Sequence, residues 1–250
     1  IAVLFGALSL LAYAGGLLCK SIAITLPATL VLYELLKRKK GHRSTGLTLM
    51  LPYHLGYWLL GAGYVLVIQQ LVRAALTSPV RALDAQIWTQ LKALVYYAKL
   101  LAMPVGLNVE HQFVAATSSA HTAVLLSALV CISALWVAWR GASRWVLFWL
   151  LWVGISLAPT LVVPLNVLVN EHRLYLPMAA GCLLGAWFFD RALAAGRGRV
   201  ALSGMAAYTM ILVVFTIERG AVWRDELALW RDAAAKAPGM LKPHLRLGDA

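Results

Sequence analysis

Two long apolar runs decide the fold: TAVLLSALVCISALWVAW (residues 122–139) and WVLFWLLWVGISLAPTLVV (residues 145–163), joined by the basic turn RGASR (residues 140–144). Each run is long enough to cross the roughly 30 Å hydrocarbon layer of a bilayer, which takes about 20 residues of helix. Because backbone groups find no water inside lipid, such a segment satisfies its hydrogen bonds internally as an α-helix. The sequence therefore predicts an all-α integral membrane protein.

Other apolar segments extend this pattern to a polytopic transmembrane helical bundle of about seven spans. The further spans are expected at Ile1–Leu18, Ile22–Leu36, Leu51–Val72, Met178–Phe189 and Val200–Ile217. Leu91–Val105 differs, because it contains Lys92 and Lys99 and ends after Pro104. We expect this segment to form an interfacial or re-entrant helix and not a full span.

The composition also indicates that lipid covers much of the surface. Of the 250 residues, 62% are hydrophobic and 13% are charged, with a mean hydropathy of +0.77. Soluble domains are nearer half apolar and about a quarter charged. The net charge of +12 would suggest nucleic acid for a soluble protein, but the basic residues lie between apolar segments and no nucleic-acid motif is present. We therefore assign the charge to membrane orientation and attraction to anionic lipid head groups.

The basic clusters give an orientation. If the spans alternate and Leu91–Val105 does not cross, then Lys37–Arg43, Arg140–Arg144 and Arg191–Arg199 all face the cytoplasm, as the positive-inside rule requires. The exoplasmic side then holds Lys20, Arg73–His121, Pro164–Pro177 and everything after Glu218. Short loops and an Ala/Arg-rich composition favour a multi-pass protein of the bacterial inner membrane. Cys19, Cys131 and Cys182 have neither ligand spacing nor an even number, so neither a metal site nor a disulfide framework is predicted.

The segment that begins at Trp223 has the pattern of a helical repeat. One face of a predicted amphipathic helix carries Trp223, Leu227, Trp230 and Ala234. Pro238-Gly239 breaks this helix, and residues 244–250 begin another. A helix, a turn with Pro and a second helix with Leu-Gly resemble the start of a tetratricopeptide repeat, in which helix pairs stack. A single juxtamembrane helix is the alternative.

Three groups of ionisable residues at the expected exoplasmic rim are candidates for ligand binding. Glu171, His172 and Arg173 lie together beside an apolar span, and a guanidinium binds phosphate in a forked, charge-assisted way. The second group is Lys99 with Glu110 and His111, and the third is Lys20 between two apolar helices. The alternatives are structural: Glu171 and Arg173 pair with each other or with head groups, Lys99 snorkels, and Glu110 and His111 belong to a solvated loop.

Three stretches, followed by the segment from Trp223, resemble one family. They are LCKSIAITLP (residues 18–27) leading to YELL (33–36), YAKLLAMPVGLNVEH (97–111) and EHRLYLP (171–177). Together they resemble the transmembrane and tetratricopeptide repeat-containing O-mannosyltransferases and their bacterial relatives, which belong to the GT-C class of glycosyltransferases. The resemblance implies a GT-C-like membrane domain over residues 1–217 and the start of an exoplasmic repeat region over residues 218–250, placed in the periplasm of a bacterium, with further sequence expected at both ends.

The resemblance also implies an activity. A sugar, typically mannose, moves from a polyprenyl-phosphate carrier to a protein hydroxyl on the exoplasmic face. In that class the general base is an acid in the first exoplasmic loop, which we expect upstream of Ile1, so the catalytic residue stays unknown here. Relatives commonly have an acid after the lysine where this chain has Ser21, which weakens any exact role for Lys20.

We expect Arg173, helped by His172 or Lys20, to neutralise the carrier phosphate as it leaves. The repeats would present the acceptor protein on their concave surface. No cofactor motif such as a P-loop or GxGxxG is present, so the lipid-linked sugar is the only small-molecule partner expected, together with membrane lipid. A non-catalytic scaffold with repeats for protein binding and a transporter are the alternatives. The transporter predicts polar residues within spans, where Tyr13, Ser127, Ser156 and Tyr208 are the few candidates.

Overall fold

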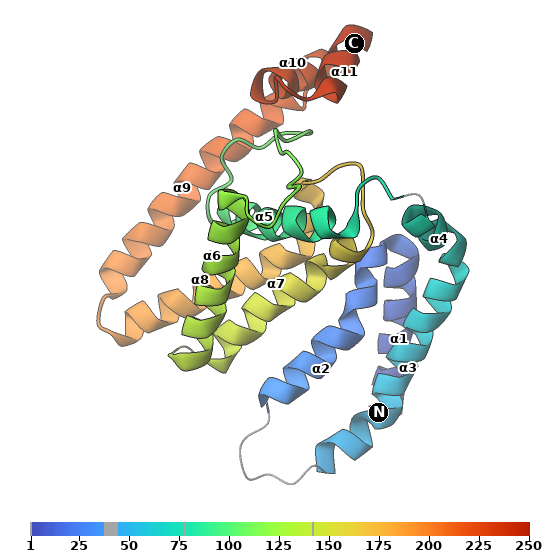
Figure 1. Cartoon of the computed structure of the whole chain (residues 1–250). Helices are drawn as coiled ribbons and strands as arrows, with labels where there is room; N and C mark the ends of the chain where they lie inside the picture. Colours follow the sequence, from blue (N-terminus) through green and yellow to red (C-terminus); the bar gives the residue numbers. More distant parts are fainter. Residues whose placement is uncertain (1, 38–44, 78, 142) are drawn as a thin grey trace. The chain divides into compact units, whose positions relative to one another are not determined.

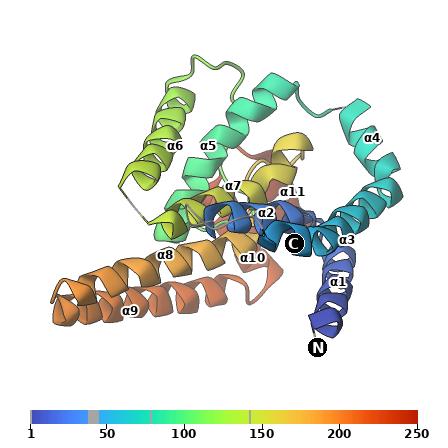
Figure 2. The ribbon, with the colours of Figure 1, turned by 90° about the horizontal axis from the view of Figure 1, so that it is seen from below.

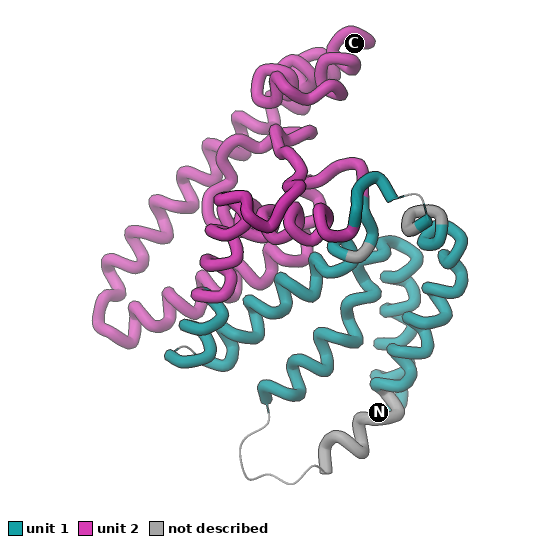
Figure 3. Tube along the Cα trace, viewed as in Figure 1, with its two compact units in different colours: residues 1–82, 134–164 teal, residues 83–133, 165–250 magenta. Residues whose placement is uncertain are grey.

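The computed structural model describes residues 2–37, 45–77, 79–141 and 143–250, and within these ranges the chain forms helices and loops but no β-strand (Figure 1). This confirms the all-α class for the described residues. The chain divides into two compact units, each assembled from two separate stretches of sequence (Figure 3). Unit 1 is Ile1–Ala82 with Ala134–Pro164, and unit 2 is Leu83–Ser133 with Leu165–Ala250.

Unit 1 has a small aromatic core. Its helices are α1 (Ala2–Cys19), η1 (Ser21–Thr25), α2 (Leu26–Lys37), α3 (Thr45–Val67), α4 (Gln69–Thr77) and α7 (Arg144–Val162). Tyr13 of α1 and Tyr57 of α3 are buried, and their ring centroids lie 5.4 Å apart in an edge-to-face arrangement. Gly61 allows this packing, because a Cβ there would lie 3.1 Å from the Tyr13 hydroxyl.

Pro27 divides the expected helix Ile22–Leu36. The structure has a short 3₁₀ helix, η1, up to Thr25, and α2 begins at Leu26, which places Pro27 in the first turn of α2. A proline is tolerated there because the first backbone N–H groups of a helix have no intrahelical partner. In a continuous helix from Ile22, the missing N–H and the clash of the ring with the preceding turn would have broken the hydrogen-bond ladder.

The expected span Leu51–Val72 is also divided, since α3 ends at Val67 and α4 begins at Gln69. The second part contains Gln69, Gln70 and Arg73, so it is amphipathic and not uniformly apolar. Of the basic loop expected at Lys37–Arg43, only Lys37 lies within the described residues. Within the Arg140–Arg144 turn only residue 142 lies outside the described residues, and the Ser143 hydroxyl caps α7 by accepting a hydrogen bond from the Trp145 N–H at 3.3 Å.

Unit 2 contains the loops that form the candidate site. Its helices are α5 (Leu83–Ala102), the first part of α6 (Thr122–Arg140), η2 (Glu171–Leu174), α8 (Tyr175–Ala194), α9 (Gly198–Val222), α10 (Glu226–Lys236) and α11 (Leu241–Asp249). Helices α8 and α9 meet at the turn that joins them (Figure 1) and run alongside each other when seen from below (Figure 2). The Tyr208 hydroxyl of α9 donates to the Ala102 carbonyl at the end of α5, at 2.9 Å. Helix α5 begins at Leu83, earlier than the expected start at Leu91.

Within the described ranges, three helices are long and apolar enough to cross a membrane: Thr122–Arg140, Arg144–Leu161 and Gly198–Val222. The first two correspond to the runs that open the sequence analysis, and their bounds agree with expectation within a residue or two. Val3–Cys19 and His54–Val67 are shorter apolar helices. In the Gly198–Val222 window no residue is buried inside the protein, so this helix presents apolar side chains all round, as a lipid-facing helix does.

The C-terminal segment forms a helix pair, α10 and α11, separated by a turn at Pro238-Gly239. Asp225 caps α10 by accepting a hydrogen bond from the Ala228 N–H at 2.7 Å. This start corrects the expected helical face, because Trp223 precedes α10 and does not share a face with Trp230. Helix α9 runs past residue 217 to Val222, so the expected boundary between membrane domain and repeats falls inside a continuous helix.

Candidate functional site

The carboxylate of Glu171 joins two loops of unit 2: the first loop lies between α5 and α6, and the second precedes η2. The Oε1 atom of Glu171 accepts a hydrogen bond from the Asn108 backbone N–H at 2.6 Å, and the His111 Nε2 atom lies 3.2 Å from the same oxygen. Tyr96, which lies on α5, completes the group through its hydroxyl, 2.9 Å from His111 Nδ1. We call these four residues the Glu171 cluster. Three of its members come from the stretches 97–111 and 171–177, which lie far apart in the sequence.

His111 is almost completely enclosed, with 2% of its side chain exposed. His111 Nε2 lies 3.2 Å from Glu171 Oε1 but makes no hydrogen bond, so this approach is an electrostatic contact. When the Tyr96 hydroxyl donates to Nδ1, the neutral imidazole carries its own proton on Nε2, facing the carboxylate. The cluster can therefore hold a histidine in one tautomer and one orientation.

Burial raises the pKa of Tyr96, and the negative charge of Glu171 raises it further. Tyr96 therefore stays a phenol that can donate to His111 at neutral pH. The exposed Lys99 lies one turn further along α5, with its ammonium 5.9 Å from the centroid of the Tyr96 ring. This distance is at the outer limit of a cation–π contact, and it places a positive charge beside the cluster.

Arg173 uses its guanidinium inside its own loop. It is buried, at 7% exposed, and its two terminal nitrogens donate to the carbonyls of Leu168 at 2.9 Å and Val167 at 2.8 Å. Asn170 fixes the next residues, because its side chain accepts from the His172 N–H and its own N–H donates to the Tyr97 hydroxyl, both at 3.1 Å. In this structure the forked donors expected to hold a phosphate instead shape the loop that carries Glu171.

Helices α10 and α11 hold the first loop from another side. The Asn108 side-chain amide donates to the Ala233 carbonyl at 3.2 Å, and the Lys236 ammonium donates to the Leu107 carbonyl at 3.2 Å. Two more contacts link α11 and the turn before it to the loop: Lys242 Nζ lies 3.3 Å from Glu110 Oε2, and the Gly239 N–H donates to Gln112 Oε1 at 3.0 Å. The loop 107–112 is therefore fixed between Glu171 and the helix pair.

The structure brings together most of the candidates. Lys99, His111, Glu171 and Arg173 lie in unit 2 in and around the Glu171 cluster, and His172 is exposed next to it in sequence. Lys20 belongs to unit 1, where it precedes η1. Sequence reasoning did not identify Asn108, Asn170 and Tyr97 as members of the site. Their contacts join residues 63 to 125 positions apart, and no local pattern signals such pairs.

Among the residues that the structure describes, no group of three or more His, Cys, Asp or Glu side chains is arranged to hold a metal ion. The sequence matches no protein-family model, and no curated protein and no solved structure matches it.

Proposed function

We propose that the chain is an integral membrane glycosyltransferase of GT-C type, which transfers a sugar, mannose by preference, from a polyprenyl-phosphate carrier to a protein hydroxyl on the exoplasmic face. The observation that supports this proposal is the hydrogen bond between Glu171 and the Asn108 N–H. It joins two of the three stretches that carry the family resemblance, and it lies in the part of the chain expected at the exoplasmic rim. The three long apolar helices support the membrane setting.

The proposed reaction breaks the bond between the anomeric carbon and the carrier phosphate oxygen and forms a bond from that carbon to the acceptor oxygen. The acceptor proton passes to a carboxylate, which the resemblance places in the first exoplasmic loop of such transferases. The leaving phosphate takes the electron pair, and its growing charge needs a cation. Lys99 is our candidate, because its side chain is exposed and its ammonium lies beside Tyr96.

The Glu171 cluster is assigned a positioning role. Its carboxylate already contacts Asn108 and His111, and Arg173 is bound to loop carbonyls. Glu171 and Arg173 therefore act by holding the loops that face the carrier. A pre-organised loop of this kind gives its charged neighbours a fixed geometry, which is what electrostatic stabilisation of a transition state requires.

A transfer assay tests the proposal. Membranes with the protein, expressed from its complete gene, are incubated with radiolabelled polyprenyl-phosphate mannose and a serine/threonine-rich acceptor polypeptide. We expect label to enter the acceptor, and Lys99→Gln to lower the rate on the order of 100-fold. Arg197→Gln, in the turn between α8 and α9, is the matched control and should keep the wild-type rate. Equal rates in all three proteins would refute the role of Lys99.

The scaffold alternative is favoured by one observation: α10 and α11 are fixed to the loop 107–112, and Leu241 and Leu245 of α11 are exposed. A rigidly held helix pair with an apolar surface suits protein binding. The scaffold predicts no transfer from any polyprenyl-phosphate sugar while the inserted wild-type protein still captures exoplasmic proteins through α10 and α11. Transfer of label by the wild type would exclude a purely non-catalytic scaffold.

The proposed orientation has its own test. In a background without Cys19, Cys131 and Cys182, a single cysteine is introduced at Ser119 or at Ala195, and intact cells are treated with a membrane-impermeant maleimide. We expect labelling at residue 119, on the exoplasmic side, and none at residue 195 until the membrane is opened. The opposite pattern would invert the orientation.

A further inference from the structure

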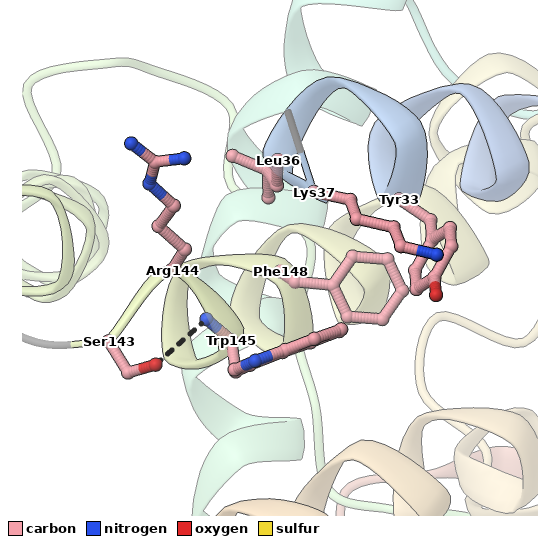
Figure 4. Close-up of a pocket in the computed structure, with 7 residues that line it drawn as sticks. All are labelled: Tyr33, Leu36, Lys37, Ser143, Arg144, Trp145 and Phe148. Atoms are coloured by element: carbon pink, nitrogen blue, oxygen red, sulfur yellow. Dashed lines mark hydrogen bonds between the residues drawn. The ribbon is translucent and has the colours of Figure 1, made fainter. Parts of the chain in front are cut away.

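Unit 1 contains a cavity of about 620 Å³ where the end of α2 meets the start of α7 (Figure 4). It is lined by Tyr33, Leu36, Lys37, Ser143, Arg144, Trp145 and Phe148. The volume falls in the range of about 300–1,000 Å³ that is typical of small-molecule sites. None of the groups in the Glu171 cluster takes part, so the cavity is separate from the proposed transfer site.

The lining is positively charged. Lys37 and Arg144 are both cationic, and the described lining residues include no acid. The nearest acid on α2, Glu34, is already paired with His54 at 2.9 Å. Figure 4 shows Lys37 reaching along Tyr33, with its ammonium 5.3 Å from the ring centroid, while Arg144 extends away from the aromatic rings. An anion in the cavity would therefore meet two positive groups, one beside the Tyr33 ring and one that points away from the rings.

The lining also contains three aromatic rings. The ring centroids of Tyr33 and Trp145 are 5.9 Å apart, those of Tyr33 and Phe148 are 6.0 Å apart, and those of Trp145 and Phe148 are 6.1 Å apart. The start of α7 adds the partial positive charge of a helix N-terminus beside Ser143. A site that combines two cations with a group of aromatic rings suits an amphiphile with an anionic head and an apolar body.

We infer that this cavity binds the phosphate of an anionic phospholipid from the cytoplasmic leaflet. Lys37 and Arg144 contact the phosphate, and the glycerol and the first part of an acyl chain lie against Tyr33, Trp145 and Phe148. Helix α7 is one of the helices long enough to span a membrane, and the cavity lies at its basic end, where head groups are found. The inference requires membrane insertion but not sugar transfer. A negative transfer assay would therefore leave the lipid site untouched, and loss of the lipid site would leave the proposed reaction untouched.

A lipid-binding measurement tests this inference. The full-length protein is placed in nanodiscs of phosphatidylcholine with an equal amount of phosphatidylglycerol, released into the mass spectrometer, and scored for retained phosphatidylglycerol. The double variant Lys37→Gln/Arg144→Gln should bind phosphatidylglycerol roughly 30-fold more weakly than the wild type, since each basic residue near an anionic surface contributes about one factor of five. Phosphatidylcholine retention should not change.

The matched control is Arg197→Gln/Arg199→Gln, which removes the same charge from the other basic turn expected on that side. It should retain phosphatidylglycerol as the wild type does. An equal loss in both double variants would overturn the inference, because it would show a general surface-charge effect and no site. Arg144→Lys, which keeps the charge, should retain most of the affinity in the intact protein.

A second experiment distinguishes a phospholipid from a soluble anion as the ligand of the cavity. The detergent-solubilised, lipid-depleted protein is titrated calorimetrically with inorganic phosphate, and then with short-chain phosphatidylglycerol. We expect heat that depends on Lys37 and Arg144 only with the lipid, because the aromatic part of the cavity contributes nothing to free phosphate. Binding of inorganic phosphate with equal affinity would overturn the assignment to a phospholipid.

Discussion

Glu171 accepts a hydrogen bond from the Asn108 backbone N–H at 2.6 Å, although the two residues are 63 positions apart in the sequence. Hydrogen bonds to a charged acceptor are stronger than neutral ones. This one ties the second loop directly to Asn108, which in turn reaches α10 through its side chain. Glu171 and Asn108 therefore connect the second loop, through the first, to α10.

Replacement of Glu171 should separate the two functions of its carboxylate. Glu171→Gln keeps an oxygen that can accept from the Asn108 N–H but removes the charge that faces His111, whereas Glu171→Ala removes both. We expect Ala to lower the free energy of unfolding by about 1–3 kcal/mol and Gln by less. Thermal unfolding in detergent measures both, and Glu218→Ala, at an exposed position, is the control. Equal losses for Gln and Ala would show that charge, and not the hydrogen bond, joins the loops.

The environment of Tyr96 predicts a response to alkaline pH. Burial and the Glu171 charge hold the Tyr96 pKa above its ordinary value of 10.0, so the folded protein keeps the proton more tightly than the unfolded chain does. The stabilisation is fully present below pH 10.0 and is lost as the pH rises from there through the higher folded pKa. The tyrosinate absorbance of wild type minus Tyr96→Phe should therefore rise above pH 10.0.

In a Glu171→Gln background the pKa of Tyr96 should fall, because the charge contribution is gone, but it should stay above 10.0 because burial is the larger cause. Tyr175→Phe, which replaces a tyrosine that is 80% exposed, controls for the loss of one phenol. A Tyr96 titration unchanged by Glu171→Gln would show that the two side chains do not lie close together in solution.

Asn108 should control the mobility of the helix pair α10 and α11. Its buried side chain donates to the Ala233 carbonyl at 3.2 Å. Asn108→Ala removes this hydrogen bond, while the carbonyl still accepts from the Ala237 N–H at 2.9 Å, so the expected cost is about 0.5–1.5 kcal/mol. We expect faster amide hydrogen exchange in residues 226–249 and unchanged exchange in α7. Asn166→Ala, at an exposed position in the other loop, should change neither. Equal amide exchange rates in α10 and α11 for Asn108→Ala and Asn166→Ala would contradict this coupling.

Arg173 separates a structural role from a direct role in phosphate binding. Arg173→Lys keeps the positive charge, but one ammonium cannot reproduce the forked contacts with the Val167 and Leu168 carbonyls. We expect both Arg173→Lys and Arg173→Ala to lower the unfolding temperature and the transfer rate while the protein stays inserted. Arg173→Lys with normal stability and normal transfer would show that the charge alone matters, as a direct phosphate contact would predict.

The long apolar helices are the part of the fold that the sequence predicts best. The runs 122–139 and 145–163 become α6 and α7 almost residue for residue, because hydrophobicity over this length leaves a helix as the only form that satisfies the backbone in lipid. Helix bounds are less accurate where polar residues mix with apolar ones. Thus α5 starts at Leu83, where Asp84 stabilises the first turn, and α3 ends before Gln69.

The candidate site is only partly predictable. The residue types of Lys99, His111 and Glu171 draw attention because ionisable groups at a membrane rim need a reason. No local sequence pattern shows that Glu171 accepts a hydrogen bond from Asn108. None shows that Arg173 donates to the carbonyls five and six residues before it. A guanidinium that binds phosphate and one that binds carbonyls look the same in a sequence, and only the folded loop distinguishes them.

The contacts of loop 107–112 also set an order for biogenesis. Its partners Ala233, Lys236 and Lys242 lie 125 to 132 residues further along the chain. While the ribosome makes α6, α8 and α9, the groups that will hold this loop have not yet been synthesised. Only the arrival of α10 and α11 supplies them. A chain truncated before residue 233 would therefore lack all three of these partners of the loop.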